Sequence, residues 1–231
     1  MTKIFCDIAD KFLVKKFAKK DIVKGFTTNP SLMSKAGAKN YKKYAIELIK
    51  LSENKPISFE VFGDDYQSMK DQALEIQNWG KNVYVKIPIV NSKNVFSGKL
   101  IKELSQKNIK LNITAVYSFE QVKKIFKVLN KKSKTIISIF AGRAGDTGKD
   151  PIPQFKKSLI LTKNYRNIEI LWASVREPYN YLQAKQLGCQ IITIPPNMIE
   201  KINKFGKSYN TLTIETVNAF LKDSIKSKFK F

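Results

Sequence analysis

Short apolar runs alternate with amphipathic segments along the chain, and this alternation constrains the fold more than any other feature. The intervening segments carry apolar residues every three or four positions, as in Val122, Phe126 and Leu129, which is typical of helices. Strands that alternate with helices form a parallel sheet with both faces covered. The eight runs cover residues 4–8, 22–27, 57–62, 83–89, 111–117, 135–141, 168–175 and 190–194.

Eight such units in 231 residues are enough to close a (β/α)8 TIM barrel. An open doubly wound sheet is the alternative fold. That fold usually carries a glycine-rich first turn, and the chain has neither a G-x-G-x-x-G nor a G-x-x-x-x-G-K-[ST] loop. We therefore expect one barrel domain over residues 1–231, in which residues 211–231 form an additional C-terminal helix.

Composition predicts a soluble cytoplasmic protein. The 43% of hydrophobic residues can fill a substantial core, but no apolar run reaches the roughly 18 residues of a membrane span. Asp7 and Asp10 interrupt the apolar N-terminal segment, unlike a signal peptide. Cys6 and Cys189 are too few for a disulfide framework, which favours a reducing compartment.

The net charge of +23 invites a nucleic-acid-binding interpretation. The lysines, however, are spread over the whole chain, and arginine, the residue that nucleic-acid readers favour, is scarce. We expect no specific nucleic-acid partner, and keep a basic nucleic-acid-binding protein as a distant alternative to an enzyme. The chain has no histidine and no cluster of cysteine or acidic residues with metal-ligand spacing, so we also expect no metal site.

Lys86 is the most unusual charged residue in the apolar runs. It lies in the sequence V-Y-V-K-I-P-I at residues 83–89, among β-branched and aromatic side chains. Such a lysine is either on an edge strand with its head in water, or it is buried and paired or reactive. Burial lowers the pKa of an ammonium group, and a neutral amine attacks carbonyl carbon to form a Schiff base.

Polar residues recur near the C-terminal ends of the other runs. In a barrel these ends converge on one mouth, where barrel enzymes place their chemistry. Each buried polar group costs free energy unless it is paired, so packing alone does not explain the recurrence. Asp7, Asn29 and Glu60 lie near the C-terminal ends of the first three runs. Because side chains two apart share a strand face, we expect common faces for Ser58 with Glu60, Asn112 with Thr114, Ser138 with Phe140, and Trp172 with Ser174.

Two of the three arginines also follow apolar runs. Arg143 and Arg176 lie just beyond predicted strand ends, whereas Arg166 lies in a polar loop. A guanidinium fork binds phosphate bidentately, which lysine does not do. The pair therefore favours a phosphorylated substrate, with a structural salt bridge to Asp146 or Glu177 as the alternative.

Several motifs together resemble those of the transaldolase family of short class I aldolases. They occur in the family's order and cover nearly the whole chain. The segment at residues 25–32 resembles the family hallmark, and the one at 85–88 resembles its Schiff-base segment. The motifs are G-F-T-T-N-P-S-L at 25–32, V-K-I-P at 85–88, N-I-T at 112–114 followed by Ser118, S-I-F-A-G-R at 138–143 and A-S-V-R at 173–176.

The resemblance implies transfer of a dihydroxyacetone unit between sugar phosphates of the pentose phosphate pathway, without a metal or an organic cofactor. Lys86 would form the Schiff base, Glu60 would shuttle protons through a water held by Thr114, and Asp7 would accept the proton of the C4 hydroxyl. The implied substrate-binding residues are Asn29, Thr28, Asn112, Ser138, Phe140, Arg143, Ser174 and Arg176.

The related fructose-6-phosphate aldolases, which release free dihydroxyacetone, are the main alternative. In those enzymes a tyrosine and a glutamine tend to replace Phe140 and Glu60, so this chain is similar to the transferases. Trp172 stands where smaller residues are common, and we expect it to narrow the mouth. The resemblance also implies a homo-oligomeric ring, often a decamer, with the last helix packed on a neighbouring subunit.

Overall fold

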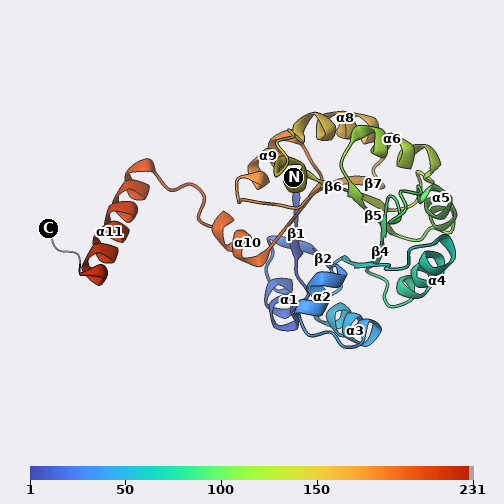
Figure 1. Ribbon diagram of the computed structural model, residues 1–231, viewed down its shortest axis with the longest axis horizontal. Coiled ribbons are helices and arrows are strands. Elements are labelled where there is room, and N and C mark those ends of the chain that lie inside the picture. The colour runs from blue at the N-terminus through green and yellow to red at the C-terminus, as the bar shows by residue number, and fades with distance from the viewer. Residues whose placement is uncertain (229–231) are drawn as a thin grey trace.

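The computed structural model describes residues 1–228, and within them eight parallel strands close into a barrel surrounded by helices (Figure 1). Each strand pairs with the next along the chain, and the last pairs with the first. The (β/α)8 fold expected from the alternation is therefore confirmed. The strands are β1 (Lys3–Asp7), β2 (Val23–Thr27), β3 (Ile57–Glu60), β4 (Val83–Pro88), β5 (Leu111–Val116), β6 (Thr135–Phe140), β7 (Ile168–Ala173) and β8 (Ile191–Ile194).

The longer helices coincide with the amphipathic patterns of the sequence. These are α3 (Tyr41–Leu51), α4 (Tyr66–Gln77), α5 (Gly98–Gln106), α6 (Phe119–Val128), α8 (Ile152–Thr162), α9 (Asn180–Leu187) and α11 (Tyr209–Ser227). Four other helices complete the described part of the chain. These are α1 (Lys11–Ala18), α2 (Pro30–Lys35), α7 (Ala141–Gly145) and α10 (Pro196–Ile202).

Apolar side chains pack on both sides of the barrel wall. A large core fills the layer between the strands and the helices, and a small cluster around Phe5, Ile136 and Leu171 fills the interior. Polar residues take over further along the same inward-facing rows: Ser138 follows Ile136, and Asp7 follows Phe5. The interior is thus an apolar floor beneath a polar mouth at the C-terminal ends of the strands.

Trp172 does not share a face with Ser174, so this part of the sequence interpretation is wrong. The indole faces outward and stacks on Phe155 of α8, with 4.6 Å between ring centroids. Ser174 has a left-handed backbone conformation, with φ of 64°, which breaks the two-residue alternation of the strand. Trp172 therefore packs behind the barrel wall and does not narrow the mouth.

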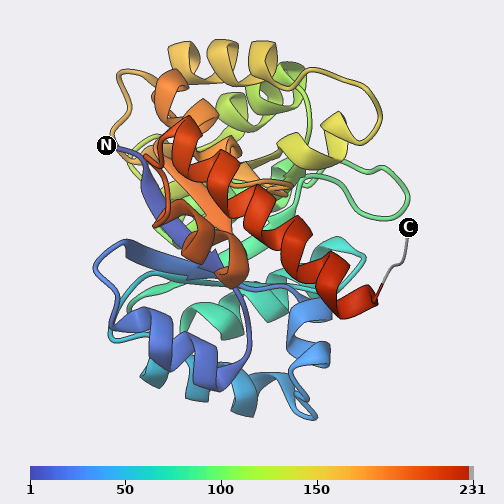
Figure 2. The same ribbon diagram turned by 90° about the vertical axis from the view of Figure 1, so that its left-hand side faces the viewer.

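The C-terminal helix is present, but it stands apart from the barrel. Figure 1 shows α11 well clear of the other helices, and Figure 2 shows the same helix running obliquely in front of the barrel. None of the residues Tyr209–Ser227 is buried. The expected range of 211–231 extends past Lys228, and its last three residues lie outside the described part of the chain.

No helix in residues 1–228 combines the length and the apolar character that crossing a membrane requires.

Candidate active site

A cavity of about 260 Å³ opens at the mouth of the barrel. Its wall brings together side chains from separate strands, as the convergence of strand ends predicts. Glu60, Thr28 and Asn112 are not part of the wall, but each contacts a residue that is. The predicted site residues in the wall are Asp7, Asn29, Lys86, Thr114, Ser138, Phe140, Arg143, Ser174 and Arg176.

Lys86 lies inside the barrel with 7% of its surface exposed. Its Nζ is 3.0 Å from Oε2 of Glu60 and donates a hydrogen bond of 3.1 Å to the carbonyl oxygen of Thr28. The parallel register of β3 and β4 places Glu60 directly beside Lys86. Because β4 pairs with strands on both sides, the edge-strand interpretation of Lys86 is wrong.

Asn112 lies behind the cavity wall in a polar chain that crosses three strands. Its Nδ2 donates to Oγ of Ser58 at 3.0 Å, and Oγ of Ser138 donates to its Oδ1 at 2.7 Å. All three residues are buried. The chain holds the Ser138 hydroxyl at the cavity and satisfies polar groups that would otherwise be costly to bury.

Asp7 heads a second hydrogen-bonded chain on the other side of the mouth. Thr27 donates its hydroxyl proton to Oδ1 of Asp7 at 2.6 Å, and the hydroxyl of Thr193 lies 2.5 Å from that of Thr27. A hydroxyl has one proton, so Thr193 is the donor to Thr27 in this arrangement. Burial raises the pKa of Asp7, against the opposing effects of the Thr27 hydrogen bond and the charge of Lys86.

The Thr114 hydroxyl is buried at the cavity wall, and it has no hydrogen-bond partner among residues 1–228. A buried hydroxyl without a partner is costly, so this position suits a polar group of a bound molecule. Just beyond it, Ala115 has φ of 58°, and the pairing of β5 with β6 shifts register between Ile113 and Val116. The irregularity ends the regular strand at the level of the mouth.

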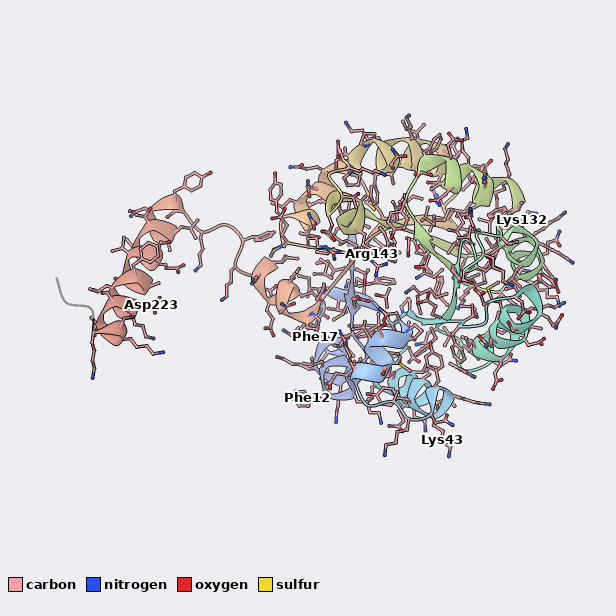
Figure 3. All side chains as sticks on the ribbon, viewed as in Figure 1. Phe12, Phe17, Lys43, Lys132, Arg143 and Asp223 are labelled. Carbon is pink, nitrogen blue, oxygen red and sulfur yellow. The ribbon has the colours of Figure 1, made fainter. Side chains whose placement is uncertain are left out.

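The two arginines occupy the side of the mouth formed by β6 and β7. Arg143 lies in α7, directly after β6, and its guanidinium is 5.6 Å from the ring centroid of Phe140. In Figure 3, Arg143 lies toward the inside of the ring of helices, whereas Lys43 and Lys132 lie at its rim. Arg143 and Arg176 both line the cavity, so the strand ends bring them together as expected.

Arg176 also forms the salt bridge that the sequence left as an alternative. Its Nε and Nη2 bind the two carboxylate oxygens of Asp146, at 2.9 Å to Oδ1 and 2.5 Å to Oδ2. This hydrogen bonding lowers the pKa of Asp146. The salt bridge uses one edge of the guanidinium and leaves the Nη1 edge for a second anion.

Gly142 allows α7 to approach the loop after β7. A Cβ at this position would lie 1.7 Å from the carbonyl oxygen of Ser174, a distance that no side chain tolerates. The absence of a side chain therefore lets the segments of Arg143 and Arg176 meet.

Sequence reasoning missed three residues that shape the site: Thr27 and Thr193 in one of the hydrogen-bonded chains, and Tyr41, whose hydroxyl bonds the backbone of Glu60. Thr193 follows an apolar residue two positions earlier in the last run, so the two-residue rule could have found it. Tyr41 opens a helix far from any strand end, and no local pattern marks it.

Comparison with known proteins gives the family. The family model described as Transaldolase/Fructose-6-phosphate aldolase matches residues 4–230. The chain belongs to this family. A probable transaldolase of Nitrosopumilus maritimus (strain SCM1) is 34% identical over 228 residues, which cover 98% of this chain and 96% of the relative. A probable transaldolase of Thermoplasma volcanium is 34% identical over 224 residues, covering 96% and 94%.

Solved structures of other proteins share the fold alone. The N-acetylneuraminate lyase of Mycoplasma synoviae aligns with a TM-score of 0.58 at 13% identity, over 96% of this chain and 82% of the lyase. A dihydrodipicolinate synthase of Rhodopseudomonas palustris aligns with a TM-score of 0.57 at 11% identity, over 84% and 69%. Together with its family membership, this makes the chain a TIM-barrel enzyme of the aldolase type.

The raised pKa of Asp7 predicts a pH-dependent effect of Asp7→Asn on stability. Above the ordinary carboxyl pKa of 3.8, the folded protein holds a desolvated charge that the unfolded chain exposes to water, so ionisation opposes folding. Below that pKa the carboxyl is neutral in both states, and the effect disappears. We expect the variant to melt a few degrees above the wild type at pH 7 and level with it near pH 3.5, by calorimetry.

Asp21→Asn is the matched control, because Asp21 is exposed in a turn. It should leave the melting temperature unchanged at both pH values. A lower melting temperature for Asp7→Asn at pH 7 would contradict the assignment of desolvation as the dominant effect on this carboxyl.

Proposed function

We propose that the chain is a transaldolase that transfers a dihydroxyacetone unit from fructose 6-phosphate or sedoheptulose 7-phosphate to an aldose phosphate, through a Schiff base on Lys86. The observation that carries the proposal is the buried Lys86 amino group, which lies in the wall of the mouth cavity and 3.0 Å from the Glu60 carboxylate behind it. Membership of the family supports the reaction class. We place the reaction in the pentose phosphate pathway and in the cytoplasm.

Schiff-base formation would begin at the Lys86–Glu60 pair. The ammonium group loses a proton to the Glu60 carboxylate, and the neutral amine attacks C2 of the ketose phosphate. Glu60 then returns the proton through a water, so that the carbinolamine loses its hydroxyl as water and the iminium forms. The unpartnered Thr114 hydroxyl at the cavity wall would hold that water.

Asp7 would drive the cleavage of the C3–C4 bond. Its carboxylate accepts the proton of the C4 hydroxyl, the bond electrons move into the iminium, and an aldose phosphate leaves. Burial raises the pKa of Asp7, which makes its carboxylate a stronger base than an exposed one. The enamine that remains on Lys86 attacks the carbonyl of the acceptor, and the same steps run in reverse.

The remaining residues would bind the sugar and its phosphate. Asn29 uses Oδ1 to cap α2, accepting from the Leu32 amide at 2.9 Å, so its Nδ2 is the group suited to a substrate hydroxyl. Ser138 would bond the three-carbon unit, with Asn112 behind it, while the Thr28 carbonyl holds Lys86. Ser174, Arg143 and the Nη1 edge of Arg176 would bind the phosphate.

Lys86→Met is expected to abolish transfer and leave the fold intact, because methionine fills similar space without a nucleophile. Incubation of the wild type with fructose 6-phosphate and borohydride should trap one adduct, located on Lys86 by peptide mass spectrometry. Lys24→Met is the control, since Lys24 lies exposed on β2. Turnover by Lys86→Met, or the absence of an adduct in the wild type, would rule out this mechanism.

We expect the enzyme to transfer the dihydroxyacetone unit and not to release it, because Glu60 and Phe140 stand where the fructose-6-phosphate aldolases tend to have glutamine and tyrosine. With fructose 6-phosphate alone, free dihydroxyacetone should appear much more slowly than product forms when an aldose phosphate acceptor is added. The measurement is an enzymatic assay of dihydroxyacetone with and without erythrose 4-phosphate. Rapid release of dihydroxyacetone without an acceptor would contradict the transferase activity and indicate a fructose-6-phosphate aldolase instead.

We also propose that the chain forms a homo-oligomeric ring, such as a decamer, in which α11 packs on a neighbouring copy. An exposed apolar stripe along this helix supports the proposal. Val217, Leu221 and Ile225 recur at helical spacing and are 57%, 58% and 69% exposed. A stripe of this kind on a helix without buried residues is typical of a surface that another chain covers.

Light scattering should then give a mass several times the 26.4 kDa of one chain. Val217→Asp places a charge in the stripe and should dissociate the assembly. Ala219→Asp adds the same charge on the opposite side of α11 and should leave the assembly intact. If light scattering of the wild type gave the mass of a single chain, the proposed ring would be contradicted.

A further inference from the structure

Strand β2 leaves the barrel wall before its neighbour β3 ends. The two strands pair only at Phe26 with Ile57 and at Thr27 with Ser58. The Thr28 amide still donates to the Ser58 carbonyl at 3.2 Å, and the chain then turns at Asn29 into α2. No residue of β2 is therefore left to pair with Glu60.

The backbone of Glu60 points toward this gap. On the other side of β3, the amide of the next residue, Val61, donates to the carbonyl oxygen of Lys86 at 3.0 Å. Successive peptide groups of a strand point in opposite directions, so the Glu60 amide and carbonyl face the side that β2 has left. Unpaired backbone groups at this depth would be costly.

The Tyr41 hydroxyl fills the place of the missing strand residue. The Glu60 amide donates to Oη of Tyr41 at 3.0 Å, and the hydroxyl donates to the Glu60 carbonyl oxygen at 3.0 Å. A phenol does both at once because it has one donor and two acceptor positions. Burial raises the pKa of Tyr41, so the hydroxyl keeps the proton that it donates.

Aromatic packing fixes the Tyr41 ring at this position. The ring meets Phe62 nearly edge-on, with 5.4 Å between centroids, and lies 5.9 Å from Trp79. Asn40 caps the helix that Tyr41 begins, by accepting from the Lys43 amide at 2.9 Å. The hydroxyl is thus held by a helix and by a cluster of rings behind the barrel wall.

We propose that Tyr41 is a positioning residue for the Lys86–Glu60 pair: by binding both backbone groups of Glu60, it holds the carboxylate at its distance from Lys86. The inference rests on the proposed role of Glu60 in proton transfer. It assigns Tyr41 to Schiff-base formation and not to phosphate binding, because Arg143 and Arg176 extend from the β6 and β7 side of the mouth. Loss of the hydroxyl frees the end of β3, and the carboxylate no longer meets the amine in one geometry.

A double-mutant cycle between Tyr41→Phe and Glu60→Gln tests this coupling. The measured quantity is the single-turnover rate of the borohydride-trappable adduct with fructose 6-phosphate. Tyr41→Phe should slow the wild type about tenfold, because small displacements of a proton-transfer group have large effects on rate. In the Glu60→Gln background the same change should have an effect of less than about twofold, since no carboxylate remains to be positioned. KM for the ketose phosphate should change less than about twofold.

Tyr44→Phe is the matched control on the same helix. The Tyr44 hydroxyl lies 3.1 Å from the carbonyl oxygen of Ala9 and 3.0 Å from that of Ala36, and its single proton is available to either of them. Its removal should cost stability without slowing adduct formation, as shown by melting temperature and by the same rate. Tyr41→Gln, whose amide offers both a donor and an acceptor, should recover part of the rate that Tyr41→Phe loses. If Tyr41→Phe does not fold, the rate loss that remains in Tyr41→Gln is used in the cycle, and it should likewise disappear in the Glu60→Gln background.

Equal effects of the Tyr41 substitution in both Glu60 backgrounds, or a rate loss in Tyr44→Phe as large as that in Tyr41→Phe, would overturn the inference. The wild type would still form its adduct on Lys86 in that case, so the proposed function would survive. A wild type that forms no adduct would remove the proposed function and the inference together.

Discussion

The ion pair between Lys86 and Glu60 depends on closure of the sheet. The two residues lie on neighbouring strands in the same parallel register, and a closed barrel turns both side chains into one interior. A lysine in that interior has no access to bulk water along a strand edge, so a carboxylate and the Thr28 carbonyl take the place of hydration. The other polar residues of the mouth are arranged around this pair.

Two hydrogen-bonded chains make the polar mouth compatible with burial. One runs through Ser58, Asn112 and Ser138, and the other from Thr193 through Thr27 to Asp7. Each chain pairs donors with acceptors across separate strands, which avoids the free-energy cost of leaving them unsatisfied. The ionised form of Asp7 remains disfavoured, because burial raises the pKa of this carboxyl more than the hydrogen bond from Thr27 lowers it. The site therefore combines satisfied polar groups with one carboxyl whose pKa is raised by burial.

The two-residue period of a strand predicted much of the site, and it failed where the backbone left strand geometry. It put Glu60 on the same strand face as Ser58, because both lie within a regular strand, whereas the burial of Lys86 was decided only by the pairing of β4 on both sides. It misplaced Trp172, because Ser174 has a left-handed backbone and reaches the mouth from a different face. The sequence also left the salt-bridge partner of Arg176 open between Asp146 and Glu177. Asp146 belongs to another βα unit, and Arg176 reaches it only because α7 folds against the loop after β7.

The sequence by itself determined the alternation of strands and helices, and with it the barrel, because hydrophobic period is a local property of the chain. It also determined which strand ends carry polar chemistry. Only the tertiary structure decided how those ends are completed: the early departure of β2, and the Tyr41 hydroxyl that takes its place beside Glu60. Such contacts join residues whose separation along the chain leaves no periodic signal, and the packing of helices against the barrel brings them together.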